Sequence, residues 1–155
     1  MRKILPILCA VLISAVNATD IVKDGKPAAT IILSPSAVKA ARFAAMELQY
    51  HIEKMTGVQL PVVTNADKAA GTKIFVGENS MQKNDFSHQE YLIRVKGDTI
   101  ILMGRDKNDA SAFDYRRFDT FPNIHHEQGT CYAVYDFLER LGVRWYLPTD
   151  LGIVY

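Results

Sequence analysis

The strongest constraint on the fold of this chain is an amphipathic pattern between Val38 and Met55. Apolar residues recur there at alternating spacings of three and four, so they share one stripe of a helix. Ser34 and Pro35 predict an N-cap followed by proline at the first helical position, and Gly57 fits the left-handed residue that ends a helix. The stripe consists of Val38, Ala41, Ala45, Leu48, Ile52 and Met55. Such a helix has to bury its stripe against another layer of the protein.

Short apolar and β-branched runs predict that this other layer is a sheet. Pro61 favours either an edge position for its strand or the start of the strand, and the pair Gly97-Asp98 predicts a tight turn between two antiparallel strands. The predicted strands cover residues 21–23, 30–33, 60–63, 73–76, 91–96, 99–103 and 143–147. A second helix is expected over residues 129–141, with Gly142 ending it. Its buried side is expected to hold Cys131, Tyr135 and Leu138 together with either Leu141 or Val134. The fold class that follows is α+β.

An irregular stretch from Arg105 to Gln128 is longer than most loops inside a domain. Aromatic residues alternate in it with two adjacent arginines; they are Phe113, Tyr115, Arg116, Arg117, Phe118 and Phe121. Aromatic rings beside arginines can stack on sugar rings or on a partner protein. The alternative is that two or three of these rings attach the loop to the rest of the domain.

The first 18 residues have the layout of a secretory signal peptide. Arg2 and Lys3 precede an apolar run from residue 4 to 16, and Val16 and Ala18 supply small residues before a cleavage site. Cleavage removes Cys9 and leaves Cys131 as a lone thiol, which we expect to be buried as a small hydrophobic residue. The mature chain is therefore predicted to be exported, to the periplasm or the extracellular space.

Removal of those 18 residues from the 155 leaves 137, enough for one domain over residues 19–155. Two of the 18 basic residues leave with the signal, so 16 remain against 17 acidic residues. A net charge of about −1 supports neither a nucleic-acid partner nor attachment to an anionic membrane.

No motif in the chain predicts catalysis, a cofactor or a metal. The run His125-His126-Glu127 lacks the spacing of three or four that places metal ligands on one helix face. His51 is expected at the surface or at the boundary of the first helix, and His88 at the start of a strand. The sequence contains no nucleophile elbow and no P-loop. Its acidic residues do not form a series at strand ends, where a pair of glycosidase carboxylates would be expected.

Three segments resemble the N-terminal accessory domain that precedes the catalytic barrel in α-glucuronidase-type glycoside hydrolases. They are GTCYAVYDFLERLGVRWYLP (residues 129–148), AAMELQYHIEKMTGVQLPVV (44–63) and IFVGENS (74–80). Their order and separation agree with the family, and together they span most of the mature chain. In the first segment the matching positions are Tyr135, Asp136, Phe137, Leu138, Glu139, Leu141, Gly142, Val143, Arg144, Trp145, Tyr146 and Pro148.

The resemblance implies a two-layer domain, similar to the second domain of β-hexosaminidases and zincin-like without a metal motif. Such a domain has a mixed sheet of about five to seven strands against two main helices. It implies a non-catalytic accessory role beside a catalytic (β/α)8 barrel, in cis or in trans, and the chain stops at Tyr155, where that barrel should begin. The apolar ending from Gly152 is expected to form a strand that pairs with a neighbour.

The resemblance transfers no catalytic residue to this chain. Binding of a partner or of an oligosaccharide is expected at Tyr115, Arg116, Arg117, Phe118, Phe121, Arg144 and Trp145. A free-standing carbohydrate-binding or partner-binding module is the alternative function.

Overall fold

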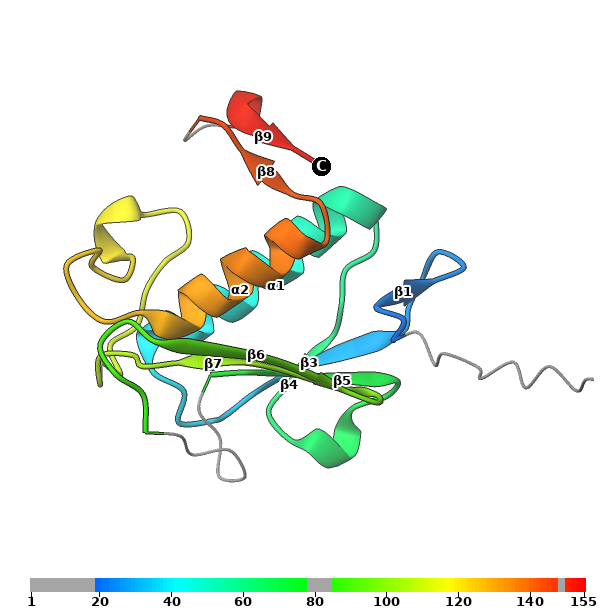
Figure 1. Cartoon of the computed structure of the whole chain (residues 1–155), viewed down its shortest axis with the longest axis horizontal. Coiled ribbons are helices and arrows are strands. Elements are labelled where there is room, and N and C mark those ends of the chain that lie inside the picture. Colours follow the sequence, from blue (N-terminus) through cyan, green and yellow to red (C-terminus); the bar gives the residue numbers. More distant parts are fainter. Residues whose placement is uncertain (1–18, 78–84, 148–149) are drawn as a thin grey trace, which may run out of the picture.

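The computed structural model describes residues 19–77, 85–147 and 150–155, so the predicted signal peptide lies outside the described residues. Two helices, α1 (Lys39–Thr56) and α2 (Gly129–Arg140), cover one face of a five-stranded sheet (Figure 1). The strands are β3 (Ala29–Leu33), β4 (Val62–Val63), β5 (Thr72–Val76), β6 (Tyr91–Lys96) and β7 (Thr99–Gly104). The predicted α+β class, with a mixed sheet against two main helices, is therefore confirmed.

The strand order in the sheet is β4-β3-β5-β7-β6. The first four strands run parallel, and β6 pairs antiparallel with β7 through the predicted turn at Gly97, whose φ is 58°. Strand β4 lies at the edge of the sheet and starts directly after Pro61, so both alternatives for this proline hold. Two small hairpins complete the fold: β1 (Val22–Lys23) with β2 (Lys26–Pro27), and β8 (Arg144–Trp145) with β9 (Ile153–Val154).

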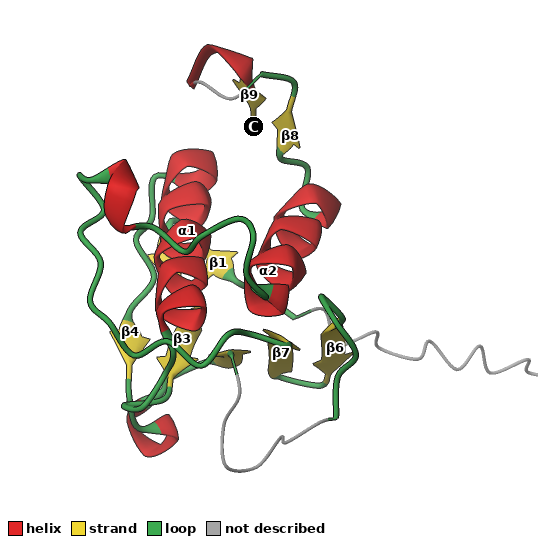
Figure 2. Ribbon diagram, turned by 90° about the vertical axis from the view of Figure 1, so that its left-hand side faces the viewer, coloured by secondary structure: helices red, strands yellow, loops and turns green. Residues whose placement is uncertain are grey.

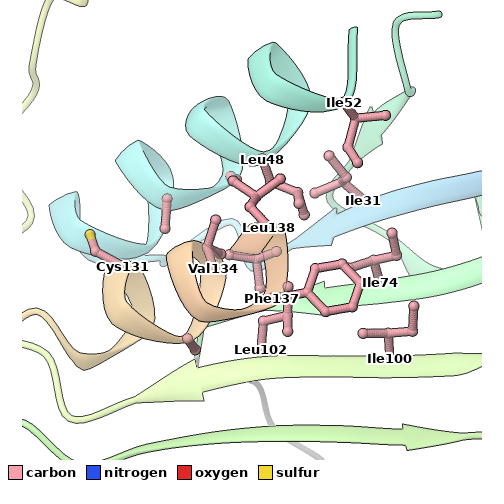
Figure 3. Packing of buried hydrophobic residues seen from close by; sticks show 14 of the residues in the cluster. Ile31, Leu48, Ile52, Ile74, Ile100, Leu102, Cys131, Val134, Phe137 and Leu138 are labelled. Carbon is pink, nitrogen blue, oxygen red and sulfur yellow. The ribbon is translucent and has the colours of Figure 1, made fainter. Parts of the chain in front are cut away.

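The main core lies between the helices and the sheet (Figure 3). Leu48 of α1 and Leu138 of α2 meet there above Ile74 of the central strand, and all three are fully buried. Each such side chain contributes about 1.5 to 3 kcal/mol through burial. In the described part of the chain, no helix is both long enough and apolar enough to cross a membrane.

Helix α1 confirms the apolar stripe but begins later than predicted. Its first residue is Lys39, because Ser34 and Ala37 close a turn through an Ala37 N–H to Ser34 C=O bond of 3.0 Å. The Ser34 hydroxyl accepts from the backbone of Ser36 and so caps this turn instead of the helix. At the other end Gly57 has φ 72°, the predicted left-handed C-cap.

The burial of α1 is wider than the predicted stripe. Phe43, Glu47 and His51 lie on a second flank, and all three are buried. The expectation that His51 lies at the surface or boundary is wrong, because α2, the long loop and the C-terminal hairpin cover this flank. His88 is exposed and lies in a turn, since β6 begins only at Tyr91.

The last predicted strand, over residues 143–147, is shorter than expected and does not join the sheet. It is β8, and it pairs with β9, so the apolar C-terminal strand has its neighbour within the chain. Gly142, with φ 115°, redirects the backbone after α2. The hairpin consequently lies beyond the helices, on the side away from the sheet (Figures 1 and 2). Val134 of α2 is buried, whereas Leu141, the residue that follows the helix, is exposed, which decides between the two alternatives for the buried side.

Candidate functional site

The candidate site is built around Glu47, a carboxylate in the middle of α1 that is only 7% exposed. The Tyr115 hydroxyl, from the long loop, donates to its Oε1 atom. The Tyr135 hydroxyl, from α2, donates to Oε2 at 2.7 Å. His51 follows one helical turn after Glu47 and places Nε2 3.5 Å from Oε2. One side chain therefore joins α1, α2 and the loop.

The electrostatics of the site follow from these contacts. Burial acts to raise the pKa of Glu47, but the hydrogen bonds from His51, Tyr115 and Tyr135 outweigh it and lower the pKa below its ordinary value. Burial raises the pKa of both Tyr115 and Tyr135, and the adjacent Glu47 charge adds to the rise. At neutral pH the site thus holds one buried negative charge and two neutral phenols.

His51 extends this network to the C-terminal hairpin. Its Nδ1 atom lies 3.0 Å from the Tyr155 hydroxyl, so with a proton on Nε2 toward Glu47 the Nδ1 atom accepts from Tyr155. The Trp145 ring packs edge-on against His51 and against Tyr135, with centroid distances of 5.5 Å in both cases. The hairpin is therefore attached to both helices through Trp145 and Tyr155.

Above Glu47 the surface is hollowed into a cleft of about 790 Å³, called here the aromatic cleft. Its walls carry six aromatic rings from α1, α2, the loop and the hairpin: Tyr50, Tyr115, Phe121, Tyr135, Trp145 and Tyr146. A second cleft of about 580 Å³ adjoins it along the loop. The two clefts share Glu47, Phe121 and Tyr135.

The structure separates the predicted site residues into two groups. Tyr115, Phe121 and Trp145 meet in the aromatic cleft, and Phe118 lies at the second cleft, 83% exposed. Tyr115 and Phe121 also pack on the ring of Phe43, at centroid distances of 5.9 and 4.7 Å. These two rings therefore attach the loop to α1 as well as line the cleft.

The three predicted arginines lie elsewhere. Arg117 pairs with Asp119 at 2.7 Å, Arg144 donates to the backbone carbonyl of Val143 at 2.8 Å, and Arg116 is exposed. None of the three is among the described residues that line either cleft. The structure therefore does not bring these arginines and the aromatic residues together in one cleft.

Within the described residues, no three or more His, Cys, Asp or Glu side chains are placed to hold a metal ion. Glu127 instead pairs with Arg105 at 2.8 Å and with His88 at 3.0 Å. His126 contacts Lys107 Nζ at 3.3 Å. These contacts hold the beginning of the long loop, at Arg105 and Lys107, against its end, at His126 and Glu127.

Cys131 is buried against α1, and its thiol contacts the Ala40 carbonyl oxygen at 3.4 Å. Burial raises the pKa of this thiol, and the charges of Asp106 and Glu47 raise it further. We expect iodoacetamide at pH 8 to leave Cys131 unmodified in the native protein and to modify it fully in urea. Mass spectrometry of the peptide that carries Cys131 measures both fractions. Rapid native modification would contradict the buried position.

Fold and site together define a two-layer α+β domain with an aromatic cleft over a buried carboxylate. In comparisons with known proteins, no family model matches the chain and no curated protein matches its sequence. The resemblance to α-glucuronidase accessory domains thus rests on the three sequence segments, and the function and export that it implies stay predictions.

Proposed function

We propose that this protein is a non-catalytic accessory domain of an exported carbohydrate-degrading glycoside hydrolase, and that it supports a catalytic (β/α)8 barrel. The α+β architecture agrees with the kind of domain that the three sequence segments resemble. The N-terminal signal pattern supports export.

The observation that carries the proposal is a group of exposed apolar side chains on the C-terminal hairpin. Leu151 is 96% exposed, and Leu147 and Val154 are more than half exposed. These three residues are called here the hairpin surface. Exposed apolar side chains that gather on one small element are typical of a protein contact. The hairpin surface also belongs to the segment that, in the resembling family, leads toward the barrel.

The environment of the acidic residues supports a role without catalysis. Both oxygens of Glu47 already accept hydrogen bonds from tyrosine hydroxyls. Asp136 is paired with Arg140 on the same helix at 3.0 Å, and Asp106 accepts from the Thr130 hydroxyl at 2.6 Å. Glycosidase carboxylates instead face each other across space for a sugar, about 5 to 10 Å apart.

The proposal predicts binding to a barrel supplied in trans. We expect the purified chain to bind the catalytic barrel of an α-glucuronidase that lacks its own N-terminal domain, in an isothermal titration. Leu151→Asp places a charge in the contact and should weaken binding at least tenfold, about 1.4 kcal/mol. The matched control is Val95→Asp, an exposed valine on the edge strand β6, which should leave affinity unchanged.

Two results would overturn the proposal. One is equal affinity, or none, for the unmodified chain and the Leu151→Asp variant. The other is hydrolysis of glucuronoxylan fragments or aryl-glycosides by the purified chain alone, lost on substitution of one acidic residue.

Phe118 favours a second candidate function, that of a free-standing carbohydrate-binding module. Its ring is exposed at the second cleft, close to the polar side chains of Asp119, Asn123 and Gln128. Titration with xylo-, gluco- and chito-oligosaccharides separates the two functions. Binding that Phe118→Ala abolishes would favour the module, and heat changes absent with every sugar would exclude it.

A further inference from the structure

We propose that the aromatic cleft over Glu47 binds a small quaternary ammonium ion, of the trimethylammonium class. This ligand goes beyond the proposed accessory function and is tested on the chain alone; Leu147 belongs both to the hairpin surface and to the cleft wall.

The walls of the aromatic cleft supply the first argument. Its six rings come from four separate segments of the chain, and each ring is partly accessible to solvent. The most accessible is Tyr146, which is 73% exposed on the hairpin. The faces of aromatic rings carry negative electrostatic potential, and several faces around one space attract an organic cation. A volume of about 790 Å³ accommodates a small ligand.

The charge of the site gives the second argument. Glu47 at the base of the cleft is buried, so its charge is poorly screened and acts strongly on anything placed in the cleft. The described residues that line the cleft include no lysine and no arginine; His51 is the one basic side chain among them, and it shares its Nε2 proton with Glu47 in the tautomer described above. An anionic ligand would therefore be repelled, and a cation would be attracted.

The tyrosine hydrogen bonds also increase the attraction of two of the rings for a cation. Tyr115 and Tyr135 both donate their hydroxyl protons to the Glu47 carboxylate. Donation to an ionised acceptor polarises each O–H bond and increases the electron density of the phenol ring. Glu47 thus acts on a ligand directly, through its charge, and indirectly, through two of the six rings.

The same hydrogen bonds select a quaternary ion over a primary amine. Oε1 already accepts from Tyr115, and Oε2 accepts from Tyr135 with His51 at 3.5 Å. A primary ammonium needs hydrogen-bond acceptors to replace water, and Glu47 has little surface left to provide them. A quaternary ammonium carries no N–H donor and needs only the charge and the ring faces. Tyr50 is the exception among the six rings, since Lys54 Nζ already lies over one of its faces, 5.3 Å from the centroid, which leaves five rings for the ligand.

The chain contains its own reporter, because its single tryptophan is Trp145 in the cleft wall. Choline is the probe, and 3,3-dimethyl-1-butanol is the control ligand, since it has the same shape with carbon in place of the charged nitrogen. We expect choline to change Trp145 fluorescence in a saturable way and to bind about tenfold more tightly than the neutral analogue. Calorimetric titration repeats the comparison without an optical signal, and sodium chloride at equal concentration controls for ionic strength.

A pair of variants locates the binding in the cleft. Tyr146→Leu removes an exposed wall ring that is not among the hydrogen-bond partners given for Glu47. It should weaken choline binding several-fold and leave the thermal stability unchanged. Tyr91→Leu is the same substitution at a partly exposed tyrosine on β6 and should have no effect on affinity. Equal binding of choline and its neutral analogue, no binding by either method, or equal affinity of the Tyr146→Leu and unmodified chains would each overturn the proposal.

Discussion

Replacing Glu47 with glutamine is expected to lower the free energy of unfolding by about 3 kcal/mol. Glutamine keeps the shape of the side chain but exchanges one acceptor oxygen for an amide group that only donates. Tyr115 and Tyr135 donate to different oxygens, so one of these hydroxyls must then face a second donor. The loss is large because Glu47 is only 7% exposed, which leaves little room for water to replace the missing acceptor.

Urea unfolding of both proteins measures this loss, and Glu53→Gln is the matched control. Glu53 lies on the same helix but is exposed, so its substitution should change stability by less than about 0.5 kcal/mol. A cost below about 1 kcal/mol for Glu47→Gln would contradict the network described for this site.

The pH dependence of the same difference tests the charge of Glu47. Its pKa in the folded protein lies below the ordinary value of 4.5, so the unfolded chain binds the proton more readily. The stabilisation by the carboxylate is therefore complete above pH 4.5 and is lost as the pH falls through the lower pKa of the folded state. The difference between the original and Glu47→Gln chains should shrink over that range, since other carboxylates are common to both. A difference that stays constant down to pH 3 would show that the charge is not stabilised by folding.

Local patterns predicted most of the layered fold. The stripe of α1, the turn at Gly97 and the edge position of Pro61 each depend on the chain within a few residues, and each is confirmed. The start of α1 was not predicted correctly, because Ser34 can cap a turn as readily as a helix. The strand predicted over residues 143–147 forms only as the short β8, which pairs with β9 outside the sheet. Its direction was not predictable, since Gly142 allows several directions and the choice depends on the packing of Trp145.

The candidate site was only partly predictable. The aromatic residues of the long loop indicate a site, but Glu47 and His51 look like ordinary polar residues beside an apolar stripe. The loop and the hairpin bury them. Tyr115 of the loop lies 68 residues after Glu47 in the sequence, and Tyr155 of the hairpin lies 104 residues after His51. The one available signal was their spacing of four, which puts a carboxylate and an imidazole on the same flank of the helix. Long-range contacts of this kind leave no periodic pattern in the sequence.

Gly129→Ala is expected to destabilise the protein by about 3 kcal/mol or more. The start of α2 lies against the end of β7, and the Gly129 N–H donates to the Arg105 carbonyl at 2.8 Å. A methyl group at Gly129 would lie 2.6 Å from the Glu90 carbonyl oxygen and 2.7 Å from the Arg105 nitrogen. Both atoms belong to the backbone, so relief requires movement of a strand end or of the helix.

Such movement would also disturb the polar contacts that hold α2 in place. The Thr130 hydroxyl accepts from the Gly104 N–H at 3.2 Å, and Asp106 accepts from the Thr130 N–H at 2.9 Å. Gly25→Ala is the control, because its φ of 68° is unfavourable for alanine but the surrounding space is open, and it should cost only about 1 kcal/mol. Thermal and urea unfolding of the two variants give the comparison. If Gly129→Ala costs no more than Gly25→Ala, the start of α2 and the end of β7 do not approach as closely as described.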